Sequence, residues 1–80
     1  MGSKASGVNR YEIEYFVIWN PDTRRFDIKL GDVKTGKFGV TKQNAIALAT
    51  NAAKFDNRES TKCAVYSFNS DGRLKLEWSS

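Results

Sequence analysis

The sequence of 80 residues contains no histidine and a single cysteine, Cys63. Without histidine, the chain cannot build a Ser-His-Asp or Cys-His catalytic arrangement and has no imidazole metal ligand. One cysteine forms neither an internal disulfide nor a zinc cluster. The carboxylates of the expected strands each have a Lys or Arg as a cross-strand partner, which favours charge pairing over acid–base catalysis. We therefore expect a protein that is not an enzyme and that holds no metal or cofactor.

Long apolar runs are also missing, since no stretch approaches the about 18 consecutive apolar residues of a membrane-spanning helix. The N-terminus lacks the apolar segment that a secretory signal needs. Cys63 lies within an apolar segment, where a reduced thiol behaves as a small hydrophobic side chain. These features predict a cytoplasmic protein that has no membrane partner.

The charge is positive but unevenly distributed along the chain. Thirteen Lys and Arg residues against nine Asp and Glu residues give a formal net charge of +4 and a pI of about 9.4. Two of the cations, Lys4 and Arg10, lie in residues 1–10, whose small and polar side chains predict a flexible tail. We expect residues 11–80 to form a single domain that is only mildly basic.

Apolar alternation predicts five strands, and an alanine-rich segment predicts one helix between the third strand and the fourth. The expected strands cover residues 11–20, 25–30, 38–40, 62–68 and 73–78. The expected helix covers residues 42–55, with Thr41 as its N-cap. The order β-β-β-α-β-β favours a two-layer α+β fold, in which the helix packs on one face of a single antiparallel sheet.

Residues 31–38 come close to a phosphate-binding Gly-x-x-x-x-Gly-Lys loop. Such a loop requires a Ser or Thr directly after the Lys and a helix that begins at once. Here Phe38 follows Lys37, and the helix is expected only after Thr41. The segment Lys34–Lys37 therefore predicts a hairpin turn and not a nucleotide site.

The candidate functional surface is the sheet face that the helix leaves open. If the helix covers the apolar side of the second and last strands, the opposite face carries cations alternating with Asp27 and Glu77; these cations are Arg25, Lys29, Arg73 and Lys75. The first and fourth strands are apolar on both sides and add apolar side chains to this face: Phe16 and Ile18 or Tyr15 and Val17 from the first strand, and Tyr66 and Phe68 or Val65 from the fourth. Tyr66 and Phe16 are the candidates for stacking. Basic groups interleaved with aromatic rings are typical of sheets that bind DNA or RNA. We expect the four cations to contact phosphates and the two rings to stack on bases.

The same face equally suits contact with a protein, because exposed apolar patches on small domains usually mark interfaces. The alternative is therefore a protein-interaction or homodimerisation domain, such as a small phage or bacterial regulator that acts on a host protein. A third interpretation is an ordinary sheet face whose aromatic rings are shielded by lysine side chains.

Two resemblances to known families accompany these patterns. The segments Phe26-Asp27-Ile28-Lys29, Thr41-Lys42-Gln43-Asn44-Ala45-Ile46 and Ser70-Asp71-Gly72-Arg73-Leu74 resemble a family of small bacterial and phage domains of unknown function. That resemblance implies strand-strand-helix-strand-strand order and brings no activity with it. Phe38-Gly39-Val40-Thr41 and the alanine-rich helix are similar to plant-type and integrase-type DNA-binding domains. This second similarity implies a three-stranded sheet that enters the major groove, with Arg25 and Lys29 as base or phosphate contacts.

Overall fold

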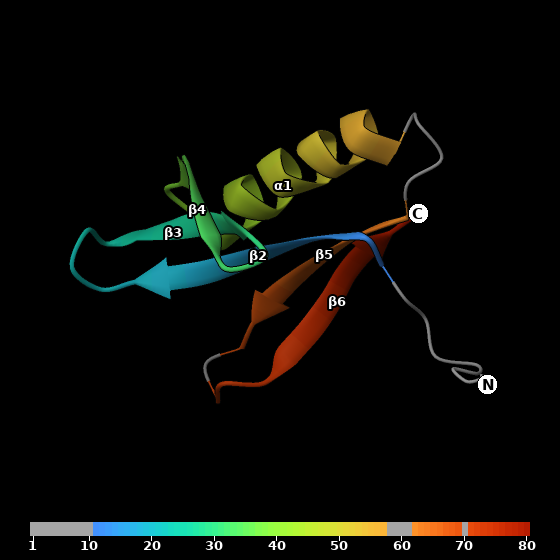
Figure 1. Cartoon of the computed structure of the whole chain (residues 1–80). Coiled ribbons are helices and arrows are strands. Elements are labelled where there is room, and N and C mark those ends of the chain that lie inside the picture. The colour runs from blue at the N-terminus through green and yellow to red at the C-terminus, as the bar shows by residue number, and fades with distance from the viewer. Residues whose placement is uncertain (1–10, 58–61, 70) are drawn as a thin grey trace.

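The computed structural model describes residues 11–57, 62–69 and 71–80 (Figure 1). The flexible tail predicted for residues 1–10 lies outside these described residues, and so does Ser70, between the last two predicted strands.

The described residues form one five-stranded sheet with a helix packed across one face (Figure 1). The strands are β2 (Ile13–Asn20), β3 (Arg25–Leu30), β4 (Val33–Gly39), β5 (Cys63–Phe68) and β6 (Leu74–Ser79), and helix α1 (Lys42–Asn57) connects β4 to β5. The spatial order of the strands is β4-β3-β2-β5-β6. The predicted two-layer α+β fold and its β-β-β-α-β-β order are confirmed.

The sheet is mixed, whereas the sequence predicts a purely antiparallel one. Three neighbouring pairs are antiparallel, but β2 and β5 run parallel to each other. The cause is the connection through α1, which carries the chain from the edge strand β4 across the sheet to the far side of β2. A helical crossover of this kind returns the next strand in the parallel direction.

The predicted turn at Lys34–Lys37 is instead an irregular part of β4. The chain reverses earlier, at Gly31 and Asp32, and the β3–β4 register then shifts so that three residues oppose Ile28. The Thr35 hydroxyl donates to the Ile28 carbonyl oxygen at 2.7 Å and accepts from the Lys37 amide at 3.1 Å. The turn-forming residues of this segment thus build a β-bulge, which bends the strand without ending it.

The core lies between α1 and the sheet face beneath it. Three alanines of α1, Ala45, Ala49 and Ala53, are fully buried, and they pack with sheet residues that include Tyr15, Val17, Ile28 and Val65. The small side chains allow a close approach of helix and sheet, as the alanine-rich sequence predicts.

The start of α1 is fixed by a side-chain cap. The Thr41 hydroxyl accepts a hydrogen bond from the Asn44 amide at 3.1 Å, which confirms the predicted N-cap. In the described part of the chain, no helix is long and apolar enough to cross a membrane.

Candidate interaction surface on the open sheet face

The sheet face opposite α1 has no second layer over it within the described residues. We call it the open face. Cross-strand pairing shows which side chains share it: Phe16 lies opposite Lys29 on one side and opposite Tyr66 on the other, and Ile18 lies opposite Asp27. The structure therefore places four of the six predicted site residues, Phe16, Tyr66, Arg25 and Lys29, on one face.

Three aromatic rings meet at the middle of the open face. Phe16 and Tyr66 stack with ring centres 5.3 Å apart and planes 15° apart. Phe68, two residues after Tyr66 on β5, also stacks on Phe16, with its ring centre 6.5 Å from that of Phe16. We call Phe16, Tyr66 and Phe68 the aromatic cluster. The rings come from the neighbouring strands β2 and β5, and Phe68 is 38% exposed, so the cluster offers ring surface to a ligand.

Tyr66 is held in place by its hydroxyl group, which donates a hydrogen bond to Glu14 Oε2 at 3.1 Å. Partial burial, followed by the hydrogen bond to Glu14 and the negative charge of Glu14, raises the pKa of the Tyr66 hydroxyl. The hydroxyl therefore stays protonated at physiological pH and can donate this bond.

Cations line the β3–β4 side of the open face. We call Arg25, Lys29 and Lys34 the basic strip. Lys29 lies directly opposite Lys34, and like charges in that position destabilise a strand pair. The structure gives neither lysine an ion-pair partner among the described residues. An anion bound between the two ammonium groups would remove this repulsion.

Arg25 is the most constrained member of the basic strip. Its guanidinium carbon lies 3.7 Å from the centre of the Phe38 ring, and its Nε lies 3.5 Å from Asp27 Oδ1. The second oxygen of Asp27 accepts a hydrogen bond from Asn20 Nδ2 at 2.8 Å. The guanidinium group is thus stacked on one side while 39% of the side chain stays exposed. Such a stacked guanidinium also suits a nucleobase.

A small cavity of about 140 Å³ extends the basic strip toward the β2–β3 turn. It is lined by Arg25, Lys34 and Lys37, together with Asp27 as the only carboxylate among its lining residues. This balance of charge gives the hollow a preference for anions.

The structure corrects the predicted positions of Arg73 and Lys75. Lys75 of β6 lies opposite Ser67 of β5. Ser67 in turn lies opposite Val17 of β2, which packs in the core beneath α1. Lys75 therefore lies on the helix side of the sheet. Arg73 precedes β6 and lies 3.6 Å from Asp71 in an exposed ion pair. Neither cation lies on the open face.

The physical reason for this correction is a second bulge. Trp78 lies opposite Val65, but Leu76 lies opposite Tyr66, so Glu77 is an extra residue in β6. The bulge lets Trp78 pack against the core, and the Ser67 hydroxyl donates a hydrogen bond to the carboxylate of Glu77 on the same side. One inserted residue moves the side chains of the preceding β6 residues to the other face of the sheet. Lys75 is therefore absent from the open face, and so is Glu77, which contacts Ser67 on the helix side.

Leu74 and Leu76 take the places that the two cations were expected to fill. They lie opposite Phe68 and Tyr66 and are 49% and 47% exposed. The open face is therefore divided into a basic half on β3 and β4 and an apolar half formed by Leu74 and Leu76 of β6, with the aromatic cluster on β2 and β5 between them.

Comparison of this chain with known proteins gives no match to a family model, to a curated protein or to a solved structure. The two resemblances that the sequence suggests thus stay predictions, and a functional argument depends on the open face itself.

Proposed function

We propose that this protein is a non-enzymatic binding module that holds single-stranded nucleic acid on its open face. The observation that carries the proposal is the aromatic cluster, in which rings from two neighbouring strands stack beside the basic strip. Bases stack on such rings with about 1–3 kcal/mol per base, with little dependence on sequence. The aromatic cluster therefore supplies base contacts, and the cations beside it supply phosphate contacts.

A single strand fits this surface better than a duplex. Exposed rings can stack only on bases that are not already stacked and paired within a helix. The guanidinium of Arg25, which lies over Phe38, adds a further flat surface at the basic edge of the face. A strand that crosses from Phe38 toward Phe68 would meet flat groups along its path and would keep its phosphates near Lys29 and Lys34.

The salt dependence of binding tests this proposal. Three phosphate contacts should weaken the binding of a short oligothymidylate about tenfold to twentyfold between about 50 and about 200 mM salt, because each contact to a single strand contributes about 0.7 to the logarithmic slope. Lys29→Gln should lower the affinity and make the slope shallower by about 0.7. Fluorescence anisotropy of a labelled oligonucleotide measures both quantities.

Lys75→Gln is the matched control, because it removes the same charge from the opposite side of the sheet. We expect it to leave the affinity and the slope close to those of the unmodified protein. If the two variants lose the same affinity, general attraction to a basic protein explains the binding, and the open face is not the site.

Self-association is a second candidate function, favoured by the exposure of Leu74 and Leu76 beside the aromatic cluster. Contacts through the apolar half would hold or tighten as salt rises, in contrast to phosphate contacts. Sedimentation equilibrium at low and high salt separates the two functions, because only self-association gives a molecular mass that grows with protein concentration.

A further inference from the structure

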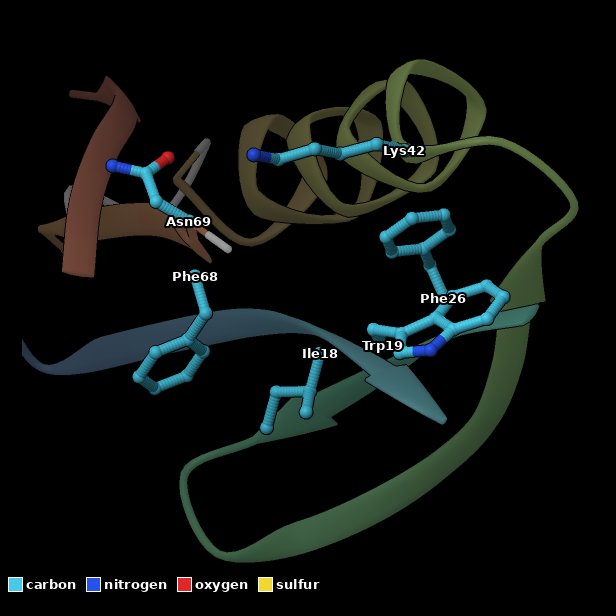
Figure 2. Close-up of a pocket in the computed structure, with 6 residues that line it drawn as sticks. All are labelled: Ile18, Trp19, Phe26, Lys42, Phe68 and Asn69. Atoms are coloured by element: carbon cyan, nitrogen blue, oxygen red, sulfur yellow. The ribbon is translucent and has the colours of Figure 1, made fainter. Parts of the chain in front are cut away.

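A cavity of about 780 Å³ opens where β2 and β5 separate. The parallel pairing of these strands ends with Val17 opposite Ser67, and their carboxyl ends then diverge (Figure 1). The cavity is lined by residues from both strands, from β3 and from the start of α1: Ile18, Trp19, Phe26, Lys42, Phe68 and Asn69 (Figure 2). Its volume lies within the range of about 300–1,000 Å³ that small-ligand sites occupy.

The walls of this cavity are apolar and largely aromatic. Trp19 and Phe26 lie together on the helix side of the sheet, with ring centres 4.9 Å apart, whereas the Phe68 ring points toward the open face (Figure 2). Trp19 is 47% exposed, although tryptophan is among the side chains that gain most from burial. The exposed indole beside Phe26 is suited to stacking against one flat aromatic group.

Two polar side chains complete the lining. The Lys42 side chain extends along the helix side of the cavity toward Asn69 (Figure 2), and the structure gives it no ion-pair partner among the described residues. The Asn69 amide offers both a donor and an acceptor, as the edge of a nucleobase requires. A ligand that complements this lining is flat and aromatic, has a hydrogen-bonding edge and carries an anionic group.

The cavity is continuous with the open face, because Phe68 belongs both to the aromatic cluster and to the cavity wall. We propose that the cavity is a nucleotide pocket: it takes one base of the strand against the Trp19–Phe26 pair, with its phosphate at Lys42. This inference rests on the proposed function, because the bound strand supplies the base. It adds a second subsite beside the open face.

A mononucleotide tests the pocket without a strand. We would titrate adenosine monophosphate into the nitrogen-15-labelled protein and follow the indole N–H signals of its two tryptophans. The signal of Trp19 should shift in a saturable way. Trp78, which packs near Lys54 toward the other end of α1, should stay unshifted in the same spectrum and serves as the internal control.

Two lysine variants test the role of the phosphate. Lys42→Gln should weaken the binding of adenosine monophosphate about tenfold, as the loss of a charged hydrogen bond does, and should not change the binding of adenosine. Lys54→Gln removes the same charge from the far part of the same helix and should change neither. The absence of a Trp19 shift at millimolar nucleotide, or equal losses in the two variants, would overturn the pocket.

The same samples separate this inference from the proposed function. If an oligothymidylate shifts the open-face amides while adenosine monophosphate leaves Trp19 unshifted, only the pocket is wrong. If the mononucleotide shifts Trp19 while the oligonucleotide binds nowhere on the open face, the pocket stands as a mononucleotide site and the proposed function is wrong.

Discussion

Replacing Gly39 with alanine should destabilise the protein by about 2–3 kcal/mol, in the upper part of the usual range for overpacked positions. Gly39 is the buried last residue of β4, where the sheet passes under the start of α1. A Cβ atom at this position would lie 2.4 Å from the Ala45 nitrogen, 2.7 Å from its Cα and 2.9 Å from its Cβ. Because two of these atoms are helix backbone, no side-chain rotation relieves the clash, and α1 must move.

Urea unfolding followed by circular dichroism measures this loss. Gly36→Ala is the appropriate comparison, because Gly36 has a φ of 84° and, apart from its own chain neighbours, no atom within 4 Å of the added Cβ. That substitution should cost about 1–2 kcal/mol through backbone conformation alone. A stable Gly39→Ala variant would contradict the close seating of α1 on the end of β4.

Removing the Tyr66 ring should weaken the binding of single-stranded nucleic acid about fivefold to 150-fold, since the stacking of one base on an aromatic side chain is worth about 1–3 kcal/mol. Tyr66→Leu is the informative variant because it keeps an apolar side chain beside Leu76 and Phe16. Tyr66→Phe keeps the ring and loses only the hydrogen bond to Glu14, so it should bind close to the level of the unmodified protein. Fluorescence anisotropy at low salt measures both affinities.

Phe55→Ala provides a control for the general loss of an aromatic residue. Phe55 is 61% exposed and lies on α1, away from the open face. We expect this variant to bind as the unmodified protein does. If Tyr66→Leu also retains full affinity while its circular dichroism is unchanged, base stacking on the aromatic cluster is not the mode of binding.

The parts of the fold that local sequence determines could be predicted. Helix capping depends on a few adjacent residues, and Thr41 caps α1 as its sequence position indicates. Strict alternation in Arg25–Leu30 places Arg25 and Lys29 on the face opposite Ile28, because β3 pairs with β2 without interruption. Phe16 and Tyr66 were candidates for the open face, but their strands are apolar on both sides, so only the pairing of β2 with β5 decides between them and their alternatives.

The features that could not be predicted depend on contacts between distant segments. The β6 bulge accompanies the packing of Trp78 against the core, and alternation within residues 73–78 carries no sign of it. Lys75 and Leu76 therefore exchange faces relative to the prediction. The parallel pairing of β2 with β5 follows from the route of α1 across the sheet, which strand patterns alone do not specify.

Lys34 and Phe38 were also missed as members of the open face. Their positions depend on the β4 bulge, which sets Lys34 opposite Lys29 and Phe38 opposite Asp27. A turn was expected there because glycine readily adopts a positive φ. Gly36 does have a φ of 84°, but within the β4 bulge. The cavity beside Trp19 forms only where two paired strands diverge, so no single segment of sequence indicates it.

An amide-resolved NMR titration with short single-stranded and duplex DNA, at about 50 and about 200 mM salt, tests the open face most directly. The proposed function predicts shifts for open-face residues of β2, β3 and β5 with the single strand, fading at the higher salt, and no matching shifts at Lys75. Unshifted spectra at both salts would contradict it. So would shifts confined to Leu74 and Leu76 that follow protein concentration without DNA, since these indicate self-association.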